Sequence, residues 1–319
     1  MAKFCVVIPS YNAARYLPQT VGSVQRQESA GDWEIVVADD GSTDDTAAVA
    51  ARLAAADTRV RYVSQPNAGV SAARNLGASH ASADCRYLWF LDSDDLLAPG
   101  ALRRMGDYLD THPDVGLLGC QLQSVHDDGT PAGPEKRSRW APGRWFDFPH
   151  QLRDDEFLTP FEAFFCGTGQ GPFALYRREV FARTEGWDPR LSYHEDTDMF
   201  CQMALQADVH YLPDRLYLKR IHAGQSTNIA DPVLAQRIWD SYDSFRQKWD
   251  ARVPRNERET RLLTRARAFY ENRFQPCRDL KLAVNIWREL LRGRSSRASA
   301  QHSLTILRKA IPTLLRPAL

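Results

Sequence analysis

The sequence lacks several features that would assign it to other classes of protein. Its six cysteines include no Cys-x-x-Cys pair and stand apart at positions 5, 85, 120, 166, 201 and 277, so we expect buried, reduced thiols. No apolar run reaches the roughly 18 residues of a membrane-spanning helix. No Gly-Lys pair of the Walker type occurs, which excludes phosphoryl transfer by a P-loop.

An excess of charge of one sign is also missing. Lys and Arg number 41 against 40 Asp and Glu, a net charge of +1, so no overall charge directs the chain to nucleic acid. The chain enters a strand-like run at once, which leaves no room for a signal peptide, and it carries no Asn-x-Ser/Thr sequon. We therefore expect a cytoplasmic protein with no nucleic-acid partner.

A basic, amphipathic stretch at residues 304–316 leaves two interpretations open. Its leucines with interspersed Lys and Arg fit a helix at the inner face of a membrane, which would make the protein peripheral there. Pro312 and Pro317 shorten such a helix. Docking on the protein's own C-terminal region, or on a second copy in a homo-oligomer, is the favoured interpretation.

The first part of the chain alternates short strand-like runs with helical stretches. The predicted strands are residues 4–8, 34–38, 60–63, 87–91 and 115–120. Strict alternation predicts an α/β fold with a Rossmann-like, mostly parallel twisted sheet flanked by helices and right-handed crossovers. We expect residues 1–120 to form one half of this domain.

The later part changes character in two steps. A loop is predicted over residues 127–155, then strands at 173–176 and 216–221 that flank a helix at 196–206, so residues 121–230 form the second half. Beyond this point strand signals vanish, and we expect an all-helical C-terminal region over residues 231–319. Its predicted helices are 233–249, 257–274, 280–291 and 298–311.

An acidic cluster, Asp92-Ser93-Asp94-Asp95, directly follows the apolar run at 87–91. Carboxylate oxygens suit Mg²⁺ or Mn²⁺, and an Asp-x-Asp pair can divide its work between such an ion and a hydroxyl-bearing substrate. Open α/β sheets bind ligands at the carboxyl ends of their strands, where this cluster would lie. The cluster therefore indicates metal-held diphosphate chemistry, with a solvated turn or helix cap as the alternative.

Three other segments follow predicted strands. Pro9 halts the first strand and Tyr11 offers a flat face on which a base can stack. Asp39 and Asp40 end the second strand, where a carboxylate can accept a hydrogen bond from a uracil-like imide. Arg74 lies one turn into the next helix, positioned for a base or a phosphate, and a surface ion pair is the alternative.

Taken in order, these segments resemble the family 2 glycosyltransferases. The matching pieces are Val6-Val7-Ile8-Pro9-Ser10-Tyr11-Asn12, Asp39-Asp40-Gly41-Ser42, Asn67-Ala68-Gly69 through Arg74-Asn75, and Asp92-Ser93-Asp94. The resemblance spans residue 4 to about residue 228 and implies a GT-A fold, a nucleoside-diphosphate sugar donor and inversion at the anomeric carbon. A UDP-sugar is expected, although thymidine diphosphate presents the same imide and GDP stays open.

The resemblance also implies roles for single residues. Pro9, Tyr11 and Asp40, with Asp39 beside it, would hold the base and Arg74 would assist. Asp92 would face the ribose or sugar, Ser93 would contact a phosphate through its backbone, and Asp94 would bind Mn²⁺ or Mg²⁺. A late His222 matches a His-Pro-Gly-x-Ser ending except for Ala223, and would join Asp94 at the metal.

The catalytic base is implied by a Glu-Asp motif at Glu195-Asp196, where Asp196 takes the matching place. An acceptor hydroxyl is a poor nucleophile until a positioned carboxylate removes its proton. Acids in the first turn of a helix are favoured by the helix dipole in any case, which is the alternative. Glu195, Trp187 and Asp188 would lie on the acceptor side, beside a glycine-rich stretch at 167–172 that lacks a dinucleotide fingerprint.

Two other functions use similar folds. A sugar-phosphate nucleotidyltransferase should carry a glycine-rich basic loop after its first strand, and residues 12–15 do not form one. A non-catalytic nucleotide-sugar-binding protein would have lost Asp94 or Asp196, and both are present. The acceptor stays open among a saccharide, a lipid-linked saccharide, a protein side chain and a small natural product.

Overall fold

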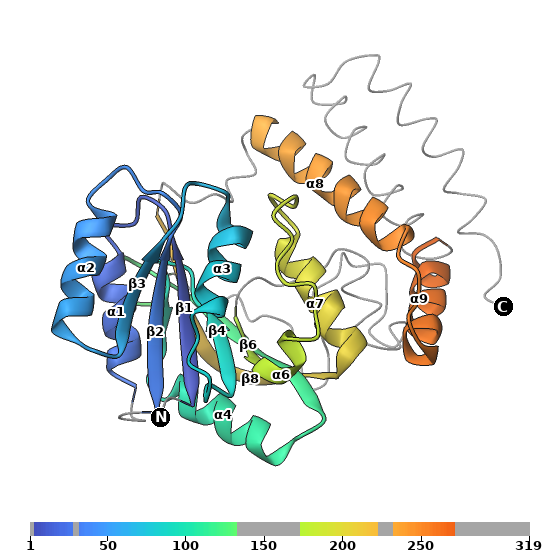
Figure 1. Cartoon of the computed structure of the whole chain (residues 1–319), viewed down its shortest axis with the longest axis horizontal. Helices are drawn as coiled ribbons and strands as arrows, with labels where there is room; N and C mark the ends of the chain where they lie inside the picture. The colour runs from blue at the N-terminus through green and yellow to red at the C-terminus, as the bar shows by residue number, and fades with distance from the viewer. Residues whose placement is uncertain (1–2, 28–31, 133–172, 223–231, 272–319) are drawn as a thin grey trace. The chain divides into compact units, whose positions relative to one another are not determined.

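The computed structural model describes residues 3–27, 32–132, 173–222 and 232–271 (Figure 1). The predicted helices at 280–291 and 298–311, the glycine-rich stretch at 167–172 and the tail at 304–316 lie outside these residues. The chain divides into two compact units. One combines Met1–Asp147 with Gly167–Trp249, and the other combines Phe148–Cys166 with Asp250–Leu319.

The first unit is built on one sheet of eight strands in the order β3-β2-β1-β4-β7-β6-β8-β5. The strands are β1 (Phe4–Ser10), β2 (Trp33–Asp39), β3 (Val60–Ser64), β4 (Tyr87–Phe90), β5 (Leu96–Leu97), β6 (Val115–Val125), β7 (Ala174–Arg177) and β8 (Asp208–Arg220). β3, β2, β1 and β4 are mutually parallel, as are β6 and β8. β7 runs antiparallel between β4 and β6, and β5 runs antiparallel to β8. The predicted mostly parallel sheet is confirmed.

The helices cover both faces of the sheet (Figure 1). Those of the first unit are α1 (Leu17–Gln25), α2 (Thr46–Ala56), α3 (Val70–Ser79), α4 (Ala101–Thr111), α6 (Arg178–Phe181), α7 (Glu195–Gln206) and α8 (Pro232–Asp250). The unit includes α8 as far as Trp249. Val6 and Ile8 of β1 join a core with α1, α2 and α4, whereas Val7 points to α3 on the other face. This alternation along one strand is the reason that both faces need helices.

The strands β1, β2 and β4 are buried along their whole length, as expected of parallel strands covered on both faces. Their register brings Ser10 beside Asp39 and Val7 beside Phe90. The carboxyl ends of these strands therefore share one edge of the sheet. The predicted base-binding segments and the acidic cluster all follow strands that end at this edge.

Two strands differ from the sequence prediction in length. β8 begins at Asp208, eight residues before the predicted start, because Pro213 and Asp214 interrupt the apolar pattern where the pairing with β6 shifts register. β6 continues to Val125 and ends in a turn in which the His126 amide hydrogen-bonds the Thr130 carbonyl. The predicted loop at 127–155 therefore begins with this turn, and its residues from 133 on lie outside the described part.

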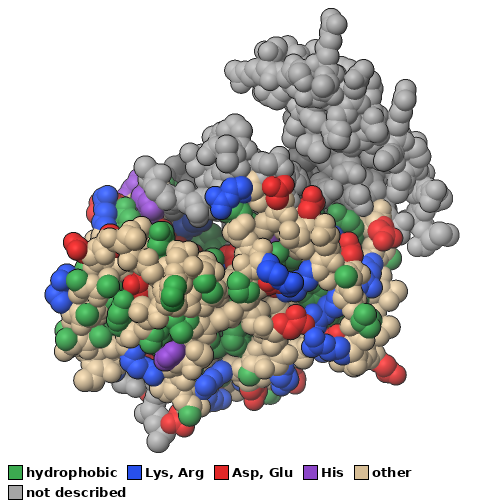
Figure 2. All heavy atoms as spheres, turned by 45° about the horizontal axis from the view of Figure 1, so that its top comes forward, with side chains coloured by type: hydrophobic (Ala, Val, Ile, Leu, Met, Phe, Trp, Pro, Cys, Tyr) green, Lys and Arg blue, Asp and Glu red, His purple; other side chains and the backbone are tan. Residues whose placement is uncertain are grey.

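The second unit contains α9 (Glu257–Phe269), which begins at the predicted residue. Its N-cap is Asn256, whose side chain accepts a hydrogen bond from the Glu259 amide. Among the described residues, no helix is both long and apolar enough to cross a membrane. On the face shown in Figure 2, the described Lys and Arg side chains are interspersed with Asp and Glu and form no large patch of one sign.

Candidate active site

The first wall of the site comes from the ends of β1 and β2. Pro9 is buried in β1, and Tyr11, just past the strand, is 51% exposed. Asp40 is buried, and its carboxylate accepts hydrogen bonds from the backbone amides of Ala68 (2.9 Å) and Gly69 (2.8 Å). This side of the site is thus made up of the exposed ring of Tyr11 and the loop that enters α3.

The neighbouring Asp39 shapes the turn after β2. Its carboxylate accepts hydrogen bonds from the hydroxyl of Ser42 (2.5 Å) and from the phenol of Tyr62 (2.9 Å). Both acids of the pair are therefore engaged with the protein itself. Their predicted contact with a base stays a prediction, and any such contact would use the remaining lone pairs of these oxygens.

Arg74 connects the acidic cluster to α7. Its guanidinium is buried between Asp92 (3.1 Å) and Glu195 (3.0 Å) and lies 4.5 Å from the centre of the Trp187 ring. The ion pair that was the alternative interpretation is present, but it is buried and not at the surface, and contact of Arg74 with a base or a phosphate stays a prediction. Burial and the negative charge of Asp196 raise the pKa of Glu195 to about 7, against the opposing effect of Arg74.

Asp94 and His222 lie together, as the resemblance implied for a shared ion. Asp94 Oδ2 and His222 Nε2 are 2.9 Å apart, although 128 residues separate them in the chain. A carboxylate oxygen and an imidazole nitrogen are both ligands that Mn²⁺ accepts. The described residues contain no group of three or more metal-ligating side chains, so these two atoms fit an ion only if substrate or water supplies its other ligands.

The turn that carries Asp94 is fastened to β8. Asp95, which received no role from the sequence, accepts hydrogen bonds from the Tyr217 hydroxyl (2.6 Å) and the Arg220 amide (2.8 Å). The buried Arg220 donates from Nε to the Asp94 carbonyl (2.7 Å). Burial, with the charges of Asp92 and Asp94, raises the pKa of Asp95 to about 8. The sequence signal that could have revealed this role is the third acid of the cluster, because one of the three acids faces inward.

On α1, Thr20 holds the same turn from the other side, because its hydroxyl donates to the Ser93 carbonyl (2.8 Å).

Beside His222 lies a pocket of about 760 Å³. Its described lining residues are Asn12, Arg15, Tyr16, His126, Asp127, Asp128, Ile221 and His222. The Tyr16 ring contacts the imidazole of His222 (4.8 Å between centres), and Arg15 forms an ion pair with Asp127 (2.7 Å).

Asp196 lies in the first turn of α7, as predicted. Its Oδ1 accepts a hydrogen bond from the Thr197 amide (2.6 Å), and its neighbour Glu195 pairs with Arg74. The residue before the helix, His194, has a φ of 64°, a left-handed conformation that is rare for a residue with a side chain. The candidate base thus begins a helix that follows a sharp, strained turn.

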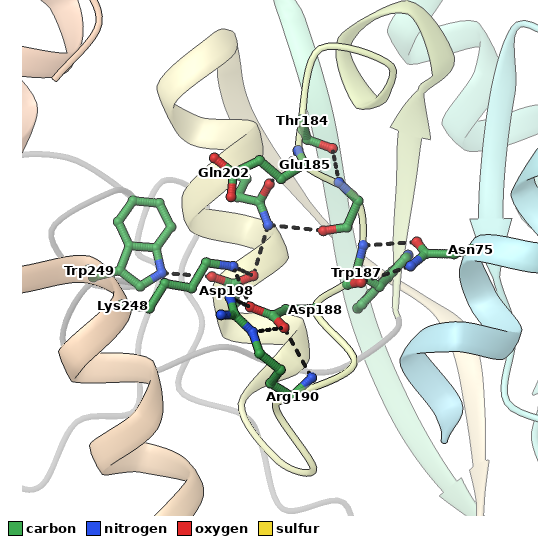
Figure 3. Close-up of polar contacts among 11 residues, drawn as sticks. Asn75, Thr184, Glu185, Trp187, Asp188, Arg190, Asp198, Gln202, Lys248 and Trp249 are labelled. Carbon is green, nitrogen blue, oxygen red and sulfur yellow. Dashed lines mark hydrogen bonds and ion pairs between the residues drawn. The ribbon is translucent and has the colours of Figure 1, made fainter. Parts of the chain in front are cut away.

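The predicted acceptor-side residues Trp187 and Asp188 point into the protein. Trp187 is buried with its ring 5.0 Å from that of Phe90, and Asn75 hydrogen-bonds both its amide and its carbonyl (Figure 3). Asp188 pairs with Arg190 and Lys248. Trp187 therefore packs in the core of the protein.

Known proteins resemble this chain in sequence. The family model for glycosyl transferase family 2 matches residues 5–184. The chain is 26% identical over 254 residues to the uncharacterized glycosyltransferase EpsJ of Bacillus subtilis, covering 75% of this chain and 67% of EpsJ. It is 28% identical over 225 residues to the chondroitin synthase of Pasteurella multocida, covering 70% of this chain but only 21% of the synthase.

Solved structures show the same fold. TarS 1-349 of S. aureus in complex with UDP-GlcNAc superposes with a TM-score of 0.59 at 18% identity, covering 98% of this chain and 89% of TarS. The mannosyltransferase PcManGT of Pyrobaculum calidifontis, in complex with GDP-Man and Mn²⁺, gives a TM-score of 0.50 at 17% identity, covering 98% and 87%. The GT-A fold expected from the sequence is confirmed.

Proposed function

Because the chain belongs to glycosyl transferase family 2, we propose that it moves a sugar from a nucleoside-diphosphate sugar to a nucleophile of its acceptor. One observation carries the proposal. Four groups to which the proposal gives a role lie around the edge of the sheet where β1, β2 and β4 end. They are the exposed Tyr11, the Asp94 and His222 pair, the buried Arg74, and the consecutive acids Glu195 and Asp196 of α7.

The donor is a uridine diphosphate sugar in this proposal. The nucleoside would stack on Tyr11, with Asp40 and the loop that it holds beside the base. Asp92 would accept a hydrogen bond from a ribose or sugar hydroxyl while Arg74 holds its other side. TarS, which has this fold, has been solved with UDP-GlcNAc, and this supports a uridine donor, whereas PcManGT, with the lower TM-score, has been solved with GDP-Man.

The leaving diphosphate would lie at Asp94 and His222, next to the pocket whose lining includes Arg15 and Tyr16. These two side chains would hold Mn²⁺ or Mg²⁺, and the ion, when bound, neutralises the charge that develops on the departing diphosphate. PcManGT has been solved with Mn²⁺, which supports a divalent ion in this proposal. Hydrogen bonds that involve Asp95, Arg220 and Thr20 hold the turn, which would fix the direction of Asp94 before any ligand arrives.

Asp196 is the proposed general base. It would take the proton of the acceptor hydroxyl as the bond from oxygen to the anomeric carbon forms and the bond from that carbon to the diphosphate breaks. Attack from the face opposite the leaving group inverts the anomeric centre, so an α-linked donor gives a β-linked product. Arg74 ties the base segment to the donor side through Glu195.

Two substitutions separate the two halves of this mechanism. Asp196→Asn should retain donor binding and lower the rate of transfer by about 10² to 10⁴, the usual contribution of a general base. Asp94→Asn should instead weaken the metal-dependent binding of the donor. Donor affinity would be measured by calorimetry and transfer by release of nucleoside diphosphate. Unchanged turnover in Asp196→Asn would remove this residue from the mechanism.

A further inference from the structure

The first turn of α7, which carries Asp196, is held by side chains of α8. Asp198 lies two residues after the candidate base and is fully buried. Its carboxylate accepts hydrogen bonds from Lys248 Nζ (2.8 Å) and from Trp249 Nε1 (2.8 Å). Figure 3 shows both donors reaching from α8 toward Asp198 on α7. Buried charges in proteins need such partners, so this contact ties the two helices together.

The same ammonium group also holds the segment before α7. Lys248 Nζ lies 3.0 Å from Asp188 Oδ2, and only 16% of the Lys248 side chain is exposed. One positive charge is thus shared by two buried carboxylates, one eight residues before Asp196 and the other two residues after it (Figure 3). Lys248 therefore fixes the spacing of the segment that contains the candidate base.

A second set of contacts from α8 holds the strained turn at His194. The Tyr193 amide donates to the Ser241 hydroxyl (3.0 Å), and this hydroxyl donates to the Tyr193 carbonyl. The His194 ring packs on the rings of Tyr242 (5.3 Å) and Phe245 (6.3 Å). A left-handed conformation at a histidine persists only when its surroundings hold it, and here these surroundings include α8.

We propose that α8 is the positioning element for the base, with Ser241, Lys248 and Trp249 as positioning residues that set the direction of the Asp196 carboxylate. This inference rests on the proposed function. The family match ends at residue 184, so it assigns nothing to α7 or α8. Held at Tyr193 on one side and at Asp198 on the other, the Glu195-Asp196 step has little freedom to turn away from the donor.

The contacts predict a particular pattern of effects. Lys248→Met leaves the buried Asp198 without its cation and leaves Asp188 with Arg190 alone. We therefore expect α7 to shift and kcat to fall by about tenfold or more, since small displacements of a reacting group are costly. The dissociation constant of the donor should stay within about twofold, because donor groups lie on other elements. Asp198→Asn combined with Lys248→Met should recover part of the lost rate, because the unpaired carboxylate is then gone.

Trp249→Phe is a gentler second variant in case Lys248→Met fails to fold. It keeps an aromatic ring but removes the hydrogen bond to Asp198, and kcat should fall while donor affinity is retained. Val49→Ala, on α2 and away from the site, is the matched control for lost stability. It should lower the melting temperature with kcat at the assay temperature unchanged.

Hydrogen exchange of the amides of residues 193–198 tests whether α8 holds this segment in place, independently of turnover. Exchange should accelerate in Lys248→Met and Trp249→Phe but not in Val49→Ala. Unchanged exchange in this segment, or a kcat that falls only as far as donor affinity falls, would overturn the inference. If instead the wild-type chain transfers no sugar from any donor while exchange responds as expected, the proposed function fails and the structural hold stands.

Discussion

At the scale of single residues, Arg74 is the group on which the two sides of the site depend. It is buried, and its two carboxylate partners come from different elements, Asp92 after β4 and Glu195 at the start of α7. A guanidinium can bond both carboxylates while lying over the Trp187 ring, a geometry that the ammonium of lysine cannot reproduce. Lysine at this position would therefore be no conservative substitution.

Glu195 makes the stability of the chain depend on pH. Its two charged neighbours act in opposite directions: the Arg74 guanidinium favours the charged form, whereas burial, together with the Asp196 carboxylate, disfavours it more strongly and raises the pKa of Glu195 to about 7. Between the ordinary glutamate value and about 7, the folded chain keeps a proton that the unfolded chain has lost. The free energy of unfolding should therefore fall as pH rises through this window, by about 3 kcal/mol.

Denaturant unfolding of the wild type and of Glu195→Gln at pH 5 and pH 8 checks this sign. The glutamine cannot titrate, so the wild type should lose stability relative to the variant on going to pH 8. Wild type and variant that change in parallel across this range would show that Glu195 keeps an ordinary pKa.

At the scale of elements, the site depends on how closely α3 approaches the sheet. A Cβ on Gly77 would lie 2.2 Å from Val7 Cγ1 and 3.4 Å from the Ala38 Cβ, so only glycine allows the observed distance between α3 and β1. Arg74 and Asn75 lie one turn earlier on the same helix. Any displacement of α3 would therefore move the partners of Asp92, Glu195 and Trp187 together.

Gly77→Ala should lower the free energy of unfolding by about 1 to 3 kcal/mol, the usual cost of overpacking a core. Val7→Ala in the same chain should restore part of this loss, because it removes the clashing methyl group. Gly22→Ala on α1 is the matched control, since its Cβ would meet only the mobile end of Arg26. This variant should be neutral or stabilising through helix propensity. Equal losses at both glycines would contradict the packing argument.

The turn after β4 owes its position to β8 as much as to its own strand. Arg220 donates hydrogen bonds from its amide to the Asp95 carboxylate and from its side chain to the Asp94 carbonyl. His222, which contacts Asp94, follows two residues later. The three acids in sequence therefore divide their work: Asp92 faces Arg74, Asp94 faces His222, and Asp95 faces inward to Tyr217. The pattern of residue types alone does not reveal which acid takes which direction.

At the scale of the whole molecule, the sequence predicted those features that depend on residue patterns repeating within a few positions. Buried β-branched runs predicted the parallel strands, and the register of these strands puts the ends of β1, β2 and β4, after which the motifs follow, at one edge of the sheet. The resemblance also paired His222 with Asp94, which the structure brings together. Contacts between distant residues, such as Lys248 with Asp198, leave no periodic signal and were not predicted.

Two further features could not be predicted from the sequence, for physical reasons. β5 has only two residues, too few for any alternation to appear. The predicted division at residues 120 and 230 follows composition, whereas the compact unit around the sheet runs on to Trp249 because α8 supplies partners to buried carboxylates of α7. That predicted division stays a prediction, because composition and compactness measure different properties.

The central claim is that a divalent cation at Asp94 joins the chain to the diphosphate of a nucleotide sugar. Its most direct test is the melting temperature of the wild type and of Asp94→Asn with UDP, UDP-sugars, TDP, GDP or uridine, each with and without Mn²⁺. Ligand at about 100 times its dissociation constant should stabilise the folded chain by about 2.7 kcal/mol. We predict stabilisation of the wild type by uridine diphosphates only when Mn²⁺ is present, and none of Asp94→Asn. Equal melting temperatures for every compound, with or without the ion, would contradict the account.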